Sequence, residues 1–116
     1  MPAPNAEDLT SRQCKPCEGG VEPLAGDAAG ELLQAIPAWE LDADAQTISR
    51  KWKCKNFVEA LEFLQKIGEV AEQEQHHPDL HLTGYNRVRV TLTTHAIGGL
   101  SENDFIVAAK LDRLAA

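Results

Sequence analysis

The sequence lacks any apolar run that approaches the roughly 20 residues of a membrane-spanning helix. Residues 1–13 also lack both common targeting patterns, which are a charged segment followed by an apolar one and an Arg-rich amphipathic segment. From these two absences we expect a soluble, untargeted protein that does not bind a membrane.

Basic residues are scarce in this chain. Of its 116 residues, 11 are Lys or Arg and 18 are Asp or Glu, and the net charge is −7. Proteins that hold nucleic acid by bulk electrostatics normally carry the opposite balance. We therefore expect no direct binding of nucleic acid.

Cysteines are few and odd in number. Three cysteines do not form the dense set of a secreted disulfide scaffold, and they suit a reducing compartment. We therefore expect a cytoplasmic protein. Cys14 and Cys17 have a Cys-x-x-Cys spacing, which lets two thiolates share a metal ion or form a disulfide. A closed structural zinc site needs four ligands, however, and no second pair follows. We favour a tight turn over a metal knuckle or a redox pair, and we expect no metal.

Length and composition limit the number of domains. A chain of 116 residues with 43% hydrophobic content has room for one small core. Residues 1–26 are rich in Pro, Gly and acidic residues and show no apolar period, so we expect a flexible N-terminal arm. Residues 27–116 are expected to form a single α+β domain.

The sequence of the first part of this domain predicts a short helix and then a hairpin. Asp27 is the expected N-cap, and the helix should stop before Pro37. Apolar and polar residues alternate over 39–41 and again over 47–55, which is typical of two strands. One face of the second strand is rich in lysine. We expect that face to be solvated, with contact to an anionic ligand or partner as the alternative.

The strongest helical pattern begins after Asn56. Asn56 and Glu59 resemble a capping box. The expected buried stripe recurs at helical spacing and contains Phe57, Leu61, Leu64, Ile67, Val70 and Ala71. Pro78 disfavours the α conformation of His77, so the helix should end near residues 75–76.

A second hairpin and a last helix complete the pattern. Residues 79–83 and 87–95 alternate, and by parity His95 lies on the polar face of its strand. Ser101 and Asp104 form a second expected capping box. The order is helix, strand, strand, helix, strand, strand, helix. It predicts an α+β fold in which a four-stranded antiparallel sheet has helices packed on one face.

Three histidines are the candidate chemical groups: His76, His77 and His95. Imidazole exchanges protons near neutral pH, since its ordinary pKa is about 6.5. Acid–base work is therefore one interpretation. Solvent-facing or locally hydrogen-bonded histidines are another. A shared metal ion is less favoured, because adjacent residues of an extended segment point to opposite sides.

The spacing of these histidines resembles the signature of a known family. Glu72-x3-His76-His77-Pro78, then Tyr85, then Thr93-Thr94-His95, then Gly99-Leu100-Ser101-x2-Asp104-Phe105 is similar to the motif of the pterin-4a-carbinolamine dehydratases (4a-hydroxytetrahydrobiopterin dehydratases). The resemblance covers residues 31–114. The Cys14-x-x-Cys17 arm looks like that of bacterial, plant and protist members rather than that of the short animal ones.

The resemblance implies a hydro-lyase. Members dehydrate 4a-hydroxytetrahydropterin to quinonoid dihydropterin and so recycle the cofactor of aromatic amino acid hydroxylases; neither a metal nor a redox cofactor is required. By this resemblance His76 and His95 are the expected acid and base, and His77 is expected to bind and orient the pterin. The alternatives are a pterin-binding or chaperoning module, for example in molybdopterin metabolism, and a regulatory dimerisation partner with little catalysis.

Three further positions match the family motif. Asp104 is expected to act with the catalytic histidines by holding one of them in a single tautomer, besides capping its helix. Glu72 is expected to bind substrate or to be merely solvated. Tyr85 is expected to stack on the pterin or, as we favour, to fill a half-buried strand position. Because a small sheet leaves edges that pair between subunits, we also expect a homodimer or a homotetramer.

Overall fold

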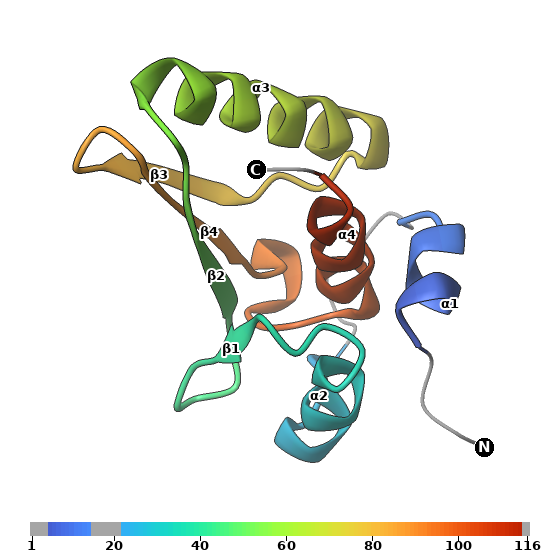
Figure 1. The fold of residues 1–116 in the computed structure, drawn as a ribbon. Coiled ribbons are helices and arrows are strands. Elements are labelled where there is room, and N and C mark those ends of the chain that lie inside the picture. The colour runs from blue at the N-terminus through green and yellow to red at the C-terminus, as the bar shows by residue number, and fades with distance from the viewer. Residues whose placement is uncertain (1–4, 15–21, 115–116) are drawn as a thin grey trace.

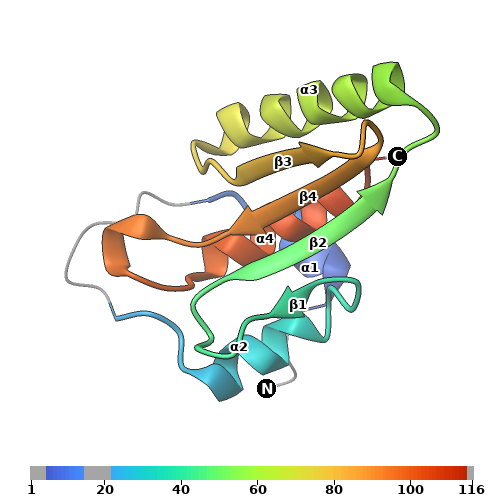
Figure 2. The ribbon, with the colours of Figure 1, turned by 90° about the vertical axis from the view of Figure 1, so that its left-hand side faces the viewer.

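The computed structural model of the chain describes residues 5–14 and 22–114. One antiparallel sheet has the order β1-β2-β4-β3, and its strands are β1 (Glu40–Leu41), β2 (Ile48–Lys53), β3 (Asp79–Thr83) and β4 (Arg87–Leu92). The helices are α1 (Ala6–Ser11), α2 (Gly26–Leu33), α3 (Phe57–Glu74), the 3-10 turn η1 (His95–Ile97) and α4 (Glu102–Asp112). The helices lie on one face of the sheet (Figures 1 and 2). The predicted fold class is confirmed.

Strands β2 and β4 form the centre of the sheet. In their antiparallel register Ile48 pairs with Leu92 and Trp52 pairs with Val88. Successive side chains of a strand point to opposite faces. These four residues share the face toward the helices, and all four are buried. The alternation predicted for both strands is therefore confirmed over the paired residues.

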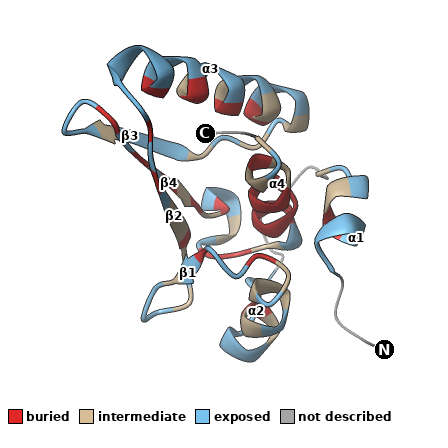
Figure 3. Ribbon diagram, in the orientation of Figure 1, coloured by how far each residue is buried: buried red, intermediate tan, exposed pale blue. Residues whose placement is uncertain are grey.

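Helix α4 lies in the middle of the molecule. Residues 103–109 are all buried, and the helix contacts both α1 and α3 (Figure 3). A helix that is buried on nearly every side needs apolar or hydrogen-bonded residues all round. The small side chains of Ala108 and Ala109 also let neighbouring segments come close. Helix α4 therefore holds the polar groups at its N-terminus in a fixed position.

Helix α1 lies within residues 1–26, for which the sequence predicted a flexible arm, and it corrects that prediction over residues 6–11. Asn5 and Asp8 form a capping box, in which each side chain accepts a hydrogen bond from the other residue's backbone N–H, at 2.8 and 3.0 Å. Leu9 is completely buried against the rest of the core. One apolar residue in a short helix creates no detectable period, so the sequence pattern missed this helix. Cys17 lies outside the described residues, and its expected turn with Cys14 stays a prediction.

Helix α3 begins and ends as predicted, and its buried stripe differs from the predicted one only in the first turns. Asn56 caps it by accepting a 2.8 Å hydrogen bond from the N–H of Glu59. Its buried residues are Ala60, Phe63, Ile67 and Ala71, whereas Phe57 and Leu61, which were expected inside, are 49% and 46% exposed. Ile67 and Ala71 are therefore buried as predicted. In the first turns, apolar residues occur on two sides of the helix, and only its packing against the sheet decides which side is covered.

The start of α2 and the end of β4 differ from the predicted boundaries. Helix α2 begins at Gly26 after Ala25, so Asp27 lies in the first turn and is not the N-cap. Strand β4 ends at Leu92 rather than continuing to His95. The chain then forms η1 and returns through Gly98, whose φ of +70° is the left-handed conformation that glycine adopts freely. His95 therefore lies on a turn.

The lengths and compositions of the helices bear on the membrane prediction. Within residues 5–14 and 22–114, none of the helices combines the length and the apolar character that crossing a membrane requires.

Candidate active site

A hollow of about 580 Å³ opens where the end of α3, the turn η1 and the segment after α1 meet. Its lining includes Cys14, His76, His77, His95 and Asn103. We call it the histidine hollow. The structure thus brings together the three histidines that the sequence singled out, although they come from two separate segments.

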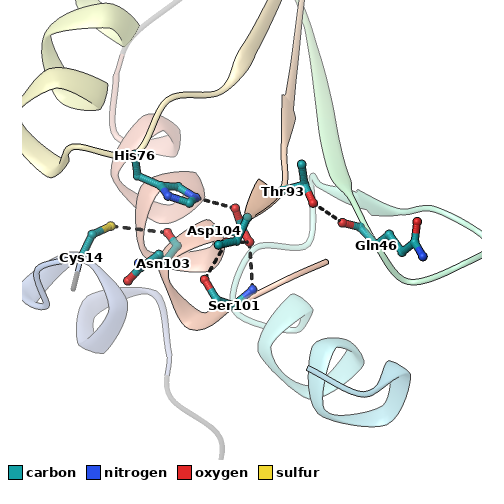
Figure 4. A network of polar contacts seen from close by, with 8 residues as sticks. Cys14, Gln46, His76, Thr93, Ser101, Asn103 and Asp104 are labelled. Carbon is teal, nitrogen blue, oxygen red and sulfur yellow. Dashed lines mark hydrogen bonds and ion pairs between the residues drawn. The ribbon is translucent and has the colours of Figure 1, made fainter. Parts of the chain in front are cut away.

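The position of His76 follows from how α3 ends. Gln75 adopts a left-handed conformation with φ of +52°, and the N–H of His76 donates to the carbonyl of Ala71 at 3.1 Å. This turn directs the imidazole toward the N-terminus of α4 (Figure 4). The His76 side chain is only 11% exposed, and its Nε2 lies 2.6 Å from Oδ1 of Asp104.

Asp104 is a completely buried carboxylate with several partners. Besides His76, it accepts hydrogen bonds through Oδ2 from the N–H of Ser101 at 2.9 Å and from Oγ1 of Thr94 at 2.8 Å. A buried charge is tolerated only when it is paired and hydrogen-bonded. The predicted capping box is confirmed. The contact with a histidine is also present, so one carboxylate serves both.

His77 and Glu72 form a more exposed pair at the rim of the hollow. His77 Nε2 lies 2.9 Å from Glu72 Oε1, and their side chains are 57% and 73% exposed. Glu72 does not line the histidine hollow, whereas His77 does. Solvent screens such an exposed pair and leaves it a small share of the folding free energy. The contact can nevertheless orient the imidazole.

His95 is the exposed histidine of η1. Its side chain makes no hydrogen bond or ion pair with the described part of the chain. The hollow is therefore bordered by one imidazole that a buried carboxylate holds and by another that can reorient. Together they offer one fixed and one adaptable site for giving or taking a proton.

Tyr85 lies elsewhere. It occupies the turn between β3 and β4 with φ of +59° and is 64% exposed, so the expected half-buried strand position is wrong. At the end of this hairpin that follows His77, Asp79 pairs with Thr91. At the other end, next to the turn, Thr83 pairs with Arg87. Tyr85 is thus at the far end of the hairpin from His77, and it does not line the histidine hollow.

Cys14 and Glu74 are residues of the hollow that the sequence did not assign to it. The N–H of Cys14 donates to Glu74 Oε1 at 2.9 Å, and its Sγ lies 3.6 Å from the carbonyl oxygen of Asn103. Lys110 donates to the other oxygen of Glu74 at 2.8 Å. These contacts attach the segment after α1 to the wall of the hollow. The Cys-x-x-Cys spacing drew attention to Cys14, but nothing local connects it to His76.

Burial and neighbouring charges shift two pKa values here. Burial, followed by the nearby Glu74 carboxylate, raises the pKa of the Cys14 thiol to about 12. Burial also raises the pKa of Glu74, but the hydrogen bonds from Lys110 and Cys14 outweigh it and leave this pKa below its ordinary value. Cys14 is therefore a neutral thiol and Glu74 a carboxylate at neutral pH.

The histidine hollow contains side chains of the types that ligate metal ions, such as Cys14 and His76. Within residues 5–14 and 22–114, His, Cys, Asp and Glu side chains form no group of three or more that could hold a metal ion. The proton-transfer chemistry described above is what the side chains of the hollow can supply by themselves.

Known proteins are similar to this chain in sequence and in fold. Residues 22–114 match the family model described as pterin 4 alpha carbinolamine dehydratase. The chain is 50% identical over 108 residues to a protein of Halorhodospira halophila that carries the provisional name pterin-4-alpha-carbinolamine dehydratase, covering 93% of this chain and 98% of that one.

Two further relatives extend the comparison. The chain is 44% identical over 110 residues to the mitochondrial pterin-4-alpha-carbinolamine dehydratase 2 of Arabidopsis thaliana, covering 92% of this chain but 59% of the plant protein. A crystal structure from Brucella melitensis, described as a transcriptional coactivator/pterin dehydratase, has a TM-score of 0.71 and 34% identity, covering 78% of this chain and 96% of that one.

Proposed function

Because the chain belongs to the pterin 4 alpha carbinolamine dehydratase family, we propose that it dehydrates a 4a-hydroxytetrahydropterin to the quinonoid dihydropterin. The observation that carries this proposal is the buried pair of His76 and Asp104 in a hollow that His77 and His95 also line. The volume of about 580 Å³ lies within the ordinary range for small-molecule sites.

The reaction is a proton-transfer problem. The bond between C4a and its hydroxyl oxygen breaks, and that oxygen leaves as water after it gains a proton. N5 loses its proton, and a C4a=N5 double bond forms, so neither an oxidant nor a reductant takes part. Hydroxide is a poor leaving group, and a general acid at the oxygen together with a base at N5 lowers the barrier.

The proposed roles follow from how each histidine is held. His76 and His95 act as the acid and the base, and Asp104 positions His76. His77 binds and orients the pterin, and Glu72 holds the His77 ring through their contact. Asp104 accepts a hydrogen bond from the ring of His76, which keeps one ring nitrogen protonated and leaves the other for the substrate.

A dehydration assay tests the proposal. The rate at which chemically generated 4a-hydroxytetrahydropterin disappears is measured without protein, with wild type, and with His76→Ala, His77→Ala and His95→Ala. His81→Ala is the matched control, because His81 is an exposed histidine of β3 outside the histidine hollow. Wild type and His81→Ala should accelerate dehydration, and the other three variants should be slower.

The same assay separates the alternatives. Equal rates with and without wild-type protein would end the dehydratase proposal. If pterin still binds in that case, a pterin-binding or chaperoning role replaces it. If His77→Ala changes mainly KM while the other two variants lower kcat, the assignment of His77 to binding is supported.

We further propose that the protein is a homo-oligomer. Phe57, Val58 and Leu61 expose 49%, 61% and 46% of their area along α3, and Leu80 on the edge strand β3 exposes 40%. Exposed apolar clusters and unpaired strand edges are common at subunit interfaces. Light scattering of wild type should give the mass of a dimer or tetramer, and Leu61→Glu should shift it downward. A monomeric wild type would contradict this.

The cellular location is proposed on composition alone. Three cysteines, two of them free thiols among the described residues, suit a reducing compartment such as the cytoplasm. Fractionation of cells that produce the natural protein tests this, and recovery from an oxidising compartment would contradict it.

A further inference from the structure

The sheet has a second face, turned away from the helices (Figure 2). Four cations occur on this face in two cross-strand pairs. Lys51 of β2 pairs in register with Arg89 of β4, and Lys53 pairs with Arg87. All four residues are exposed. Since directly paired residues of neighbouring strands point to the same side, these side chains form one group, which we call the basic sheet face.

Folding does not account for this arrangement. Like charges placed directly opposite each other across two strands destabilise a sheet. Within the described part of the chain, none of the four cations forms an ion pair with a carboxylate. The chain has 18 acidic residues and a net charge of −7, so neutralising partners are plentiful elsewhere. Four of its 11 cations are nevertheless concentrated on one face without them.

Arg50, which lies next to Lys51 on β2, differs from these four cations because it has an acidic partner. Arg50 points to the other face, toward the helices, where it pairs with Asp112 and lies 4.5 Å from the centre of the Trp52 ring. The charge of Arg50, which faces the helices, is therefore compensated by Asp112. Lys51 and Lys53 face solvent and are available to an anion from solution.

The basic sheet face also has a suitable shape. A hollow of about 550 Å³ lies on it and is lined by all four cations together with Trp52 and Val88. None of the residues that line this hollow lines the histidine hollow. A ligand held here would therefore leave the histidines accessible.

We propose that the basic sheet face binds a small molecule that carries a chain of two or more phosphate groups. Arginine offers a planar fork that matches phosphate oxygens, and lysine adds a compact charge. Neighbouring strands are about 4.8 Å apart, and alternate residues along a strand are about 7 Å apart. Each of the two rows contains one Lys and one Arg, and these long side chains can converge on a short chain of phosphates.

A long nucleic acid is the less favoured ligand. The four cations occupy only two rows of the sheet, and a chain with net charge −7 repels an extended polyanion beyond them. A short polyphosphate places all of its charge inside the hollow. The local positive charge therefore serves a compact anion better than an extended one.

Calorimetric titration with inorganic triphosphate tests the proposal. Wild type should bind it, and the Arg87→Gln/Arg89→Gln variant should bind at least about tenfold more weakly, as expected when charge-assisted hydrogen bonds are lost. Lys66→Gln is the matched control, because Lys66 is an exposed cation of α3 outside this hollow. Its affinity should equal that of wild type.

Thermal unfolding supplies a second readout, and its response to triphosphate is one that a merely solvated face would not give. Without ligand, Arg89→Gln should melt at a higher temperature than wild type, because the repulsion with Lys51 is removed. With triphosphate, wild type should gain stability and the double variant should not. A cooperative melting transition of each variant without ligand also shows that the variant is folded.

Three outcomes would overturn the proposal. Wild type could fail to bind triphosphate, the double variant could bind as tightly as wild type, or a single-stranded RNA ten-mer could bind wild type more tightly than triphosphate does at the same ionic strength. The last outcome would make the basic sheet face a nucleic-acid surface instead. None of these outcomes bears on the dehydratase assay, since the two hollows share no lining residue.

Discussion

The imidazole of His76 and the carboxylate of Asp104 lie 2.6 Å apart although 28 positions separate them in the sequence. The first residue follows the left-handed end of α3, and the second belongs to the first turn of α4, where it also caps the helix. Local backbone geometry therefore aims each group, and the packing of α3 against α4 brings the two together. The pair joins the fold to the proposed chemistry.

Replacing the carboxylate should separate positioning from binding. Asp104→Asn keeps the size of the side chain but weakens its acceptance of a hydrogen bond from His76. We expect kcat for pterin dehydration to fall about 100-fold with little change in KM, because general acid–base groups contribute at least this much. Steady-state kinetics and their pH profile measure it.

Asp112→Asn is the control for this experiment. Asp112 accepts a hydrogen bond from Trp39 and pairs with Arg50, and it does not line the histidine hollow. This variant should lose stability while keeping kcat. A wild-type kcat in folded Asp104→Asn would remove Asp104 from the proposed mechanism.

Stability in acid should depend on Glu74. Burial raises the pKa of Glu74, but Lys110 and Cys14 outweigh it, and the pKa lies below its ordinary value of 4.5. The carboxylate therefore contributes stability above that value and loses it as the pH falls through the folded-state pKa. Glu74→Gln should cost about 1–3 kcal/mol of unfolding free energy at neutral pH. Its stability should then fall less than that of wild type between about pH 5 and pH 3.

Denaturant titrations at several pH values measure this difference. Glu102→Gln is the matched control, because Glu102 and Arg12 form an ion pair whose side chains are 50% and 43% exposed. Such a pair contributes at most about 1 kcal/mol. Parallel pH profiles for wild type and Glu74→Gln would contradict the prediction.

The thiol of Cys14 should resist alkylation in the folded protein. Burial and then Glu74 raise its pKa from 9.0 to about 12, so very little thiolate is present at pH 8. We expect reaction with iodoacetamide, followed at this residue by peptide mass spectrometry, to be about 100-fold or more slower in the folded than in the urea-unfolded chain. Glu74→Gln should speed it. Equal folded and unfolded rates would mean that Cys14 is not held in the wall of the hollow.

Leu9 tests whether α1 is part of the folded core. Its side chain is completely buried. Leu9→Ala should lower the unfolding free energy by about 2–5 kcal/mol, the usual cost of emptying a buried leucine site. Glu7→Ala, at an exposed residue of the same helix, is the control and should cost much less. A loss at Leu9 no larger than at Glu7 would show that α1 does not stabilise the core in solution.

Much of the local structure follows from the sequence by itself. Strand alternation over β2 and β4, the caps at Asn56 and Ser101, and the end of α3 before His76 all depend on residues within a few positions of one another. Periodicity and capping report such short-range relationships directly. The histidine spacing was sufficient to suggest the family, and the matching family model supports it.

Tertiary packing decided the rest. It selected the stripe of α3 around Ala60 and Phe63 over the one around Phe57 and Leu61, since both stripes have helical spacing. It also brought Cys14 to Glu74, which is 60 positions away, and set Lys51 opposite Arg89. No local pattern encodes such pairs, because each depends on which surfaces become buried together when the whole chain folds. The sequence therefore determined which groups were available, and the packed structure determined which of them meet.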